Sequence, residues 1–220
     1  MKKLLLATTA ALGLAASAGG ANATLTYTVW TGGGLPLSAT FPVPTTGFVT
    51  TFTDDNNILA FRDNNPQGGP VTFNDFCGTG SAHGLQSACS HFTPAQLAET
   101  MSTIGNGTTT FIEITETYNL TTSPGPVTLD HDDGAAIYLD GAGNGAQLCG
   151  QPGQASENTQ TCAFPLGIHT LTLLYTEDNG SPAILEVALP AEVPEPASLA
   201  LLGSALAGLG VLMHRRRKNA

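Results

Sequence analysis

The chain has 220 residues, with 17 acidic and seven basic ones, and its formal net charge is −10. Six of the basic residues stand near the two ends, so residues 24–193 hold one arginine and 16 acidic residues, a formal charge of −15. This balance excludes binding to a nucleic-acid backbone, which requires lysine and arginine to displace counterions, and it suits solubility and divalent cations.

The first residues have the pattern of a secretory signal peptide. Lys2 and Lys3 precede an apolar run at residues 4–18, and the small-x-small triplet of residues 21–23 follows. This order predicts a signal peptide over residues 1–23 that is cleaved after Ala23. A membrane anchor is the alternative, but the run is short and is followed at once by strand-like residues.

Residues 24–190 read as one all-β domain. Short runs of β-branched and aromatic residues alternate with turn signals, which predicts a sandwich or a barrel. Ala135, Ile137 and Leu139 alternate with Ala136 and Tyr138, so this strand should have an inward and an outward face. The predicted strands are residues 24–30, 47–53, 58–62, 108–118, 127–130, 135–140, 168–175 and 183–189.

One helix is predicted within this domain. Thr93 is a suitable N-cap, Pro94 fits the first helical position, and Gln96 stands three residues after the cap. We expect the helix to run to about Met101.

The four cysteines are an even number in an exported chain, which indicates two disulfides. Sequence alone allows three pairings. We favour local pairing of Cys77 with Cys89 and of Cys149 with Cys162, because each pair brackets a Gly-rich loop without a strand signal of its own. A Cys₄ zinc site is disfavoured because no Cys-x-x-Cys spacing occurs.

An Asp-rich turn follows the strand predicted at residues 127–130. Carboxylates crowded at a strand end repel one another unless a cation lies among them, and Ca²⁺ takes six to eight oxygen ligands. The alternative is a capped turn, in which an aspartate accepts from local amides and Gly134 supplies positive φ. The predicted metal ligands are Asp130, Asp132, Asp133, Asp140 and Asn144.

The same region carries a family resemblance. The Asp132-Asp133-Gly134 turn, the strand that ends in Asp140-Gly141, and residues 167–187 together resemble the second half of a PA14-type β-sandwich. The resemblance covers residues 127–189. It implies that the aspartate pair, joined by a cis peptide bond, binds Ca²⁺, which in turn holds carbohydrate hydroxyls.

The last residues have three parts in a fixed order. The motif Val193, Pro194, Glu195 and Pro196 lies within a linker at residues 191–196, where prolines on both sides of Glu195 keep the chain extended. Residues 197–213 carry no charge and are long enough for a transmembrane helix. Residues 214–220 form a basic cytoplasmic tail with the membrane-stop residues Arg215, Arg216, Arg217 and Lys218.

This order resembles the PEP-CTERM sorting signal, also labelled an ice-binding protein C-terminal domain. The resemblance implies an exosortase-type protease as partner and the envelope of a Gram-negative-type bacterium as location. The chain would be inserted in the inner membrane and then released to the outer surface or an exopolysaccharide matrix. A plain C-terminal tail anchor is the alternative.

No pattern predicts an enzyme, since Gly-x-Ser-x-Gly is absent and the alternating carboxylates Glu113 and Glu116 fit an exposed strand face. The sequence therefore predicts an exported, Ca²⁺-dependent module for carbohydrate binding or adhesion. The alternative is a passive structural protein of the matrix with no specific ligand.

Overall fold

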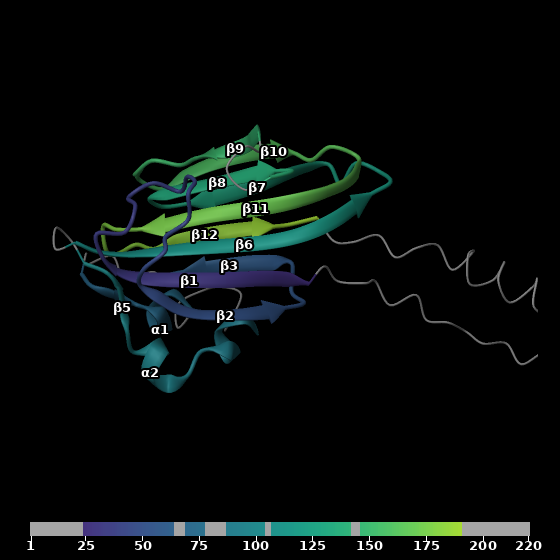
Figure 1. Cartoon of the computed structure of the whole chain (residues 1–220). Helices are drawn as coiled ribbons and strands as arrows, with labels where there is room; N and C mark the ends of the chain where they lie inside the picture. The colour runs from purple at the N-terminus through teal and green to yellow at the C-terminus, as the bar shows by residue number, and fades with distance from the viewer. Residues whose placement is uncertain (1–23, 64–68, 78–86, 104–106, 142–145, 191–220) are drawn as a thin grey trace, which may run out of the picture. The chain divides into compact units, whose positions relative to one another are not determined.

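A computed structural model describes residues 24–63, 69–77, 87–103, 107–141 and 146–190 (Figure 1). The signal peptide, the 191–196 linker, the membrane helix and the basic tail expected from the sequence lie outside these ranges. The strands are β1 (Leu25–Gly33), β2 (Phe48–Asp54), β3 (Ile58–Arg62), β4 (Val71–Thr72), β5 (Thr100–Ser102), β6 (Thr108–Leu120), β7 (Pro126–His131), β8 (Gly134–Leu139), β9 (Ala146–Gln151), β10 (Asn158–Ala163), β11 (Gly167–Glu177) and β12 (Ile184–Ala188).

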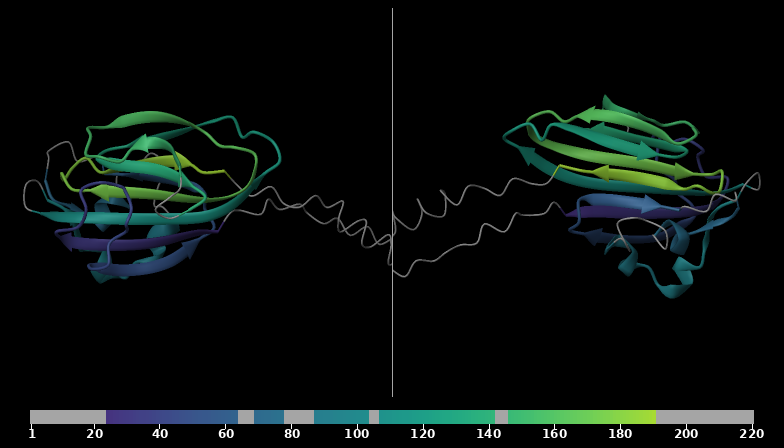
Figure 2. Two further views of the ribbon diagram at one scale, coloured as in Figure 1. Left: turned by 45° about the horizontal axis from the view of Figure 1, so that its top comes forward. Right: turned by 180° about the vertical axis from the view of Figure 1, so that it is seen from behind.

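Two antiparallel sheets form a sandwich, which confirms the predicted all-β class (Figures 1 and 2). The larger sheet has the strand order β2-β1-β6-β11-β8-β9, and the smaller one has the order β10-β7-β12-β3. A third, two-stranded sheet pairs β4 with β5. Between β3 and β6 lie two helices of four residues, α1 (Phe73–Phe76) and α2 (Pro94–Leu97), and the 3₁₀ helix Ser87–His91.

All eight predicted strands are present, but four strands were missed. Two of the missed strands, β4 and β5, are only two and three residues long. The other two, β9 and β10, occupy a stretch that was interpreted as a Gly-rich loop. They are edge strands with mostly polar, solvent-facing side chains, so they lack the apolar alternation that marks a half-buried strand.

The core lies between the two sheets. Tyr27, Ile114 and Leu173 project into it from the larger sheet, and Leu129 and Leu185 project from the smaller one. Each fully buried side chain of this size stabilises the fold by about 2 kcal/mol. The alternation predicted for β8 and β11 places Ile137 and Leu173 inside.

The outward face of β8 is not exposed as predicted. Ala136 and Tyr138 are buried beneath residues 35–43, where Leu35 and Ala39 pack over the larger sheet. The Tyr138 hydroxyl donates a hydrogen bond of 2.9 Å to the Ala39 carbonyl. A long excursion between β1 and β2 thus adds a second small core.

Both predicted disulfides are present, but they connect different parts of the fold. Cys77 and Cys89 close a local loop. Cys149 lies in β9, at the edge of the larger sheet, and Cys162 lies in β10, at the edge of the smaller sheet. The second disulfide therefore joins the two sheets and does not bracket a loop.

The predicted helix begins where expected but ends early. The Thr93 side chain accepts from the Gln96 amide and the Gln96 side chain accepts from the Thr93 amide, which forms a capping box. The helix ends at Leu97, and Met101 is a buried residue of β5. Pairing of β5 with β4 prevails over the helical propensity of this stretch.

Candidate functional site

The Asp132–Asp133 turn connects β7 in the smaller sheet to β8 in the larger one. Asp133 has φ of 55°, so the aspartate adopts the left-handed conformation that the sequence assigned to Gly134. A Cβ on Gly134 would approach the Pro152 carbonyl oxygen to 2.3 Å, so this glycine permits close backbone packing instead. The peptide bond between Asp132 and Asp133 is trans, unlike the bond that the resemblance implied.

The Asp133 carboxylate is bound by the turn between β11 and β12. Its Oδ2 accepts from the backbone amides of Asp178 and Asn179 at 2.8 and 3.0 Å, and its Oδ1 accepts from Asn179 Nδ2 at 3.1 Å. Asp133 is 1% exposed. The predicted capping role is thus correct in kind, although the capped amides lie about 45 residues away and not in the same turn.

Three more carboxyl groups gather around Asp133. Asp132 is 7% exposed, and burial raises its pKa to about 6. Burial, together with a hydrogen bond to the Asp133 side chain, raises the pKa of Asp178 to about 7. Burial and the nearby charge of Asp133 raise the pKa of Glu177 well above its usual value. The four groups therefore share one acidic cluster.

Glu177 anchors the cluster to the rest of the fold. It is fully buried, and its two oxygens lie 2.7 Å from the Tyr175 hydroxyl and 3.0 Å from the Ser102 hydroxyl. The Ser102 oxygen also accepts from the Gly180 amide at 3.1 Å. Strand β5 is thereby tied to the same turn that Asp133 caps.

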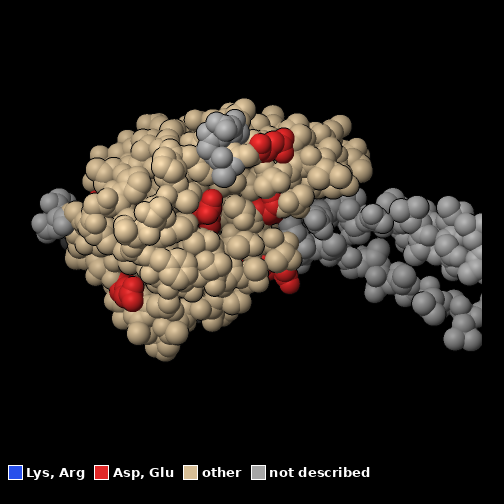
Figure 3. All heavy atoms as spheres, in the orientation of Figure 1, with Lys and Arg blue, Asp and Glu red and all other residues tan. Residues whose placement is uncertain are grey.

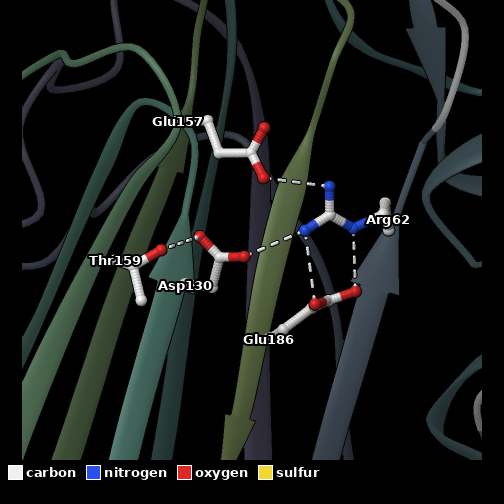
Figure 4. A network of polar contacts seen from close by, with 5 residues as sticks. All are labelled: Arg62, Asp130, Glu157, Thr159 and Glu186. Carbon is white, nitrogen blue, oxygen red and sulfur yellow. Dashed lines mark hydrogen bonds and ion pairs between the residues drawn. The ribbon is translucent and has the colours of Figure 1, made fainter.

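Asp130, one of the predicted ligands, lies on the outer face of the smaller sheet. Its Oδ2 is 2.9 Å from Arg62 Nη2, and the same guanidinium pairs with Glu186 at 2.9 Å and with Glu157 at 3.1 Å (Figure 4). Thr159 donates to the other Asp130 oxygen. Three carboxylates on three elements thus converge on one arginine, which we call the Arg62 network.

Asp140, another predicted ligand, ends β8 and pairs with β11. Its Oδ2 lies 2.6 Å from His169 Nδ1, and its Oδ1 accepts from the Thr170 amide at 3.1 Å. His169 Nε2 lies 3.0 Å from the Leu166 carbonyl oxygen. Because both ring nitrogens face acceptors, the arrangement is satisfied fully by the imidazolium form.

The structure therefore separates the predicted ligands. Asp132 and Asp133 lie together, whereas Asp130 is in the Arg62 network and Asp140 is paired with His169. Asn144 lies outside the described residues. Within the described ranges no set of three His, Cys, Asp or Glu side chains converges as a metal cage.

Sequence reasoning missed Glu177, Asp178, Asn179 and Ser102. The Glu-Asp-Asn-Gly run after β11 carried a signal, because it is a turn sequence rich in oxygen ligands at the end of a strand. Ser102 carried none, since only the chain path brings β5 beside β11.

The sorting segment matches by sequence. Residues 192–217 match the family model of the PEP-CTERM protein-sorting motif. Among the residues that the structure describes, no helix is long and apolar enough to span a membrane. The predicted span at residues 197–213, the Val193–Pro196 motif and the basic stop at 215–218 lie outside those ranges.

Comparison with curated proteins gave no significant match. Among solved structures, the PA14 domain of the MpAFP antifreeze protein matches with a TM-score of 0.42 and 13% identity over 79% of this chain and 87% of that one. A PA14 sugar-binding domain from an RTX adhesin matches with a TM-score of 0.34 and 15% identity over 78% of this chain and 94% of that one. The GH31 alpha-xylosidase from Xanthomonas citri matches with a TM-score of 0.38 and 11% identity over 80% of this chain.

Two of these three structures are PA14 domains, as the resemblance of residues 127–189 predicted. The chain spans only 14% of the length of the alpha-xylosidase. With TM-scores below 0.5, these likenesses carry no argument about ligand or activity. In contrast, the family-model match shows that this chain carries a PEP-CTERM protein-sorting motif at residues 192–217, which marks an exported protein that a membrane protease processes.

Proposed function

We propose that the exported domain is sorted to the cell envelope or the extracellular matrix and acts there as a Ca²⁺-dependent carbohydrate-binding module. The observation that supports this is the acidic cluster of Asp132, Asp133, Glu177 and Asp178. Its carboxyl groups interact with one another at a turn that joins the two sheets.

The cluster has no lysine or arginine to neutralise it. Arg62 is the one Lys or Arg between residues 24 and 193, and its guanidinium is engaged by Asp130, Glu157 and Glu186. Figure 3 likewise shows acidic side chains, and no Lys or Arg, among the described atoms of the face in view. A divalent cation is therefore the natural counter-charge.

The donor chemistry fits a hard cation. Asp132 and Asp178 offer carboxylate oxygens whose pKa values are raised by burial to about 6 and about 7, so a bound cation would compete with protons there. Asp133 would contribute less freely, because three N–H groups already occupy its oxygens. The proposed ligands are therefore Asp132, Asp178 and Asp133, which would have to move closer together, because they do not converge as a cage in the described structure.

A thermal melt of the exported domain with Ca²⁺ and with chelator tests this proposal. Ligand at 100 times its dissociation constant adds about 2.7 kcal/mol, which is several degrees for a domain of this size. Asp132→Asn with Asp178→Asn should abolish the shift, and Asp55→Asn, an exposed change elsewhere, should keep it. The double variant should also lose Ca²⁺-dependent retention on polysaccharide, and Asp55→Asn should keep it.

A passive structural role in the matrix is the second candidate. The capped state of Asp133 favours it, because this carboxylate is already satisfied without a metal. This role requires a melting temperature that does not respond to chelator and no glycan retention with or without Ca²⁺. The melt therefore separates the two candidates.

A further inference from the structure

The segment that leads to the sorting motif is anchored to the sandwich at Leu189. Leu189 is held on both sides of its peptide unit, since its amide donates to the Asn57 carbonyl at 2.9 Å and its carbonyl accepts from Asn57 Nδ2 at 2.6 Å. The matched sorting motif begins at residue 192. The motif therefore starts three residues beyond a fixed point.

Three segments beside this point contain no charged residue. They are the β6–β7 connection at residues 119–129, the β10–β11 connection at residues 163–168, and residues 187–190, and we call their surface the exit face. None of these segments contains Asp, Glu, Lys or Arg, in a domain that otherwise carries 16 acidic residues. The register places the segments together, because Gly167 pairs with Leu120 and Ala163 pairs with Pro126.

The exit face also displays apolar side chains. Ile168 is 71% exposed and Leu166 is 56% exposed, and Ile58, which pairs with Ala188 at the border of the face, is 54% exposed. These are three of the five large apolar side chains that are exposed among the described residues. Exposed apolar groups gathered at one end commonly mark an interaction site.

A groove crosses this face. It has a volume of about 460 Å³ and lies between the start of β7 and the end of β12. Two prolines of the β6–β7 connection form one wall and Pro190 closes the groove next to the sorting motif. The lining residues are Pro124, Pro126, Val127, Thr128, Ala188, Leu189 and Pro190.

We propose that the exit face is a docking surface for the membrane protease that processes the sorting motif, and that it receives an apolar, uncharged element of that protease. The inference rests on the proposed sorting of the chain and adds a second contact outside the motif. Pro194 lies five residues beyond Leu189, a reach of at most about 18 Å, so a protein that holds Pro194–Pro196 must come close to this face.

The chemistry of the face favours a protein over a lipid surface. Proteins that rest on lipid present cationic and aromatic side chains at the interface. The exit face has no cation, and its groove has a mostly apolar lining, which fits a protruding element of a partner. The acidity of the remaining domain would direct such a partner to this uncharged end.

Processing of the full-length chain in cells that carry the protease tests the proposal. Ile168→Glu and Ala188→Glu each place a charge on the exit face at an exposed position, and Phe48→Glu places one at the opposite end of β1, where Phe48 pairs with Trp30 and is 61% exposed. Pulse-chase labelling measures the rate at which the precursor is converted. This rate should fall about tenfold or more in the first two variants, because an unpaired charge is costly at an apolar contact. Phe48→Glu should match the parent.

Two outcomes would overturn the inference in different ways. If the parent is processed and both exit-face variants are processed at its rate, the docking surface is wrong while sorting stands. If the parent is not processed at all, the sorting proposal fails and the docking surface fails with it. As a second measurement, a photocrosslinker at position 168 should give an adduct with an epitope-tagged protease, and labelling of lipid alone would contradict a protein partner.

Discussion

Cys149 and Cys162 lie on the edge strands of different sheets, and their disulfide brings their Cα atoms to 5.5 Å. Strands β9 and β10 are mostly polar and contribute little to the core. Cys162 is buried in the main cluster of apolar side chains, and Cys149 is partly buried against the same cluster. The covalent bond therefore closes an edge of the sandwich that side-chain packing would hold weakly.

The first prediction concerns this bond. Replacing both cysteines, Cys149→Ala with Cys162→Ala, should lower the free energy of unfolding by about 3 kcal/mol, the usual effect of opening a loop of this length. Urea unfolding under non-reducing conditions measures it. Amide hydrogen exchange should rise in β9 and β10 first. Uniform exchange across both sheets would show that the edge is not a separately stabilised unit.

Both disulfides could be predicted from the sequence, but the strands β9 and β10 that carry the second one could not. Spacing and an even cysteine count were enough to suggest local pairs. Strands β9 and β10 could not be recognised because a solvent-facing edge strand has no apolar period, and Gln147, Gln151 and Gln160 do not favour strand over loop. Only the paired neighbours β8 and β7 make them strands.

The second prediction concerns the Arg62 network. Arg62→Gln leaves Asp130, Glu157 and Glu186 facing one another without a cation, so like-charge repulsion should cost about 1–2 kcal/mol of stability at neutral pH. Adding Glu186→Gln to this variant should restore part of the loss. Denaturant unfolding in low and high salt measures it, since salt screens the repulsion. Equal losses in both salts would point to lost packing of the Arg62 stem instead.

The candidate site was only half predictable for a similar reason. Asp132 and Asp133 stand out in the sequence because like charges are adjacent at a strand end. Asp130 and Asp140 looked equivalent to them, but strand alternation turns Asp130 to the outer face and the β8–β11 pairing gives Asp140 to His169. Glu177 and Ser102 join the cluster through contacts across 75 residues of sequence, which no local pattern reports.

The third prediction concerns pH and the pair formed by His169 and Asp140. The hydrogen bond to Asp140 raises the pKa of His169, and that of Asp140 is lowered by the same bond. The His169 contribution to stability is thus fully present below the ordinary histidine pKa of about 6.5 and is lost as pH rises through the raised value. The Asp140 contribution is lost only in acid.

An NMR titration of the His169 ring measures this directly. The midpoint should lie above that of an unpaired histidine, and Asp140→Asn should bring it back towards the ordinary value. An unchanged His169 midpoint in Asp140→Asn would rule out this pair as the cause of the shift.

The fourth prediction concerns the buried acid Glu177. Its pKa is raised by burial and by the charge of Asp133, so it stays protonated in the folded state at pH values where the unfolded chain has lost the proton. The folded state then binds more protons than the unfolded one, and stability falls as pH rises above about 4.5, by up to about 1.4 kcal/mol per pH unit. Asp132 and Asp178 add to the same trend from the ordinary aspartate pKa of about 4 up to about pH 6 and about pH 7, respectively.

Glu177→Gln reproduces the protonated shape without the ionisable group. It should equal the parent in stability near pH 4 and exceed it at pH 8, as measured by denaturant unfolding at both values. Glu99→Gln, a change outside the acidic cluster, should leave the pH dependence of the parent intact. Because the proposed Ca²⁺ ligands are Asp132, Asp178 and Asp133, Ca²⁺ should raise the stability of the parent and of Glu177→Gln alike at pH 8. If the stability of the parent in chelator does not change from pH 5 to pH 8, Glu177 ionises in the folded state at no cost. The acidic cluster would then need no cation to balance its charge.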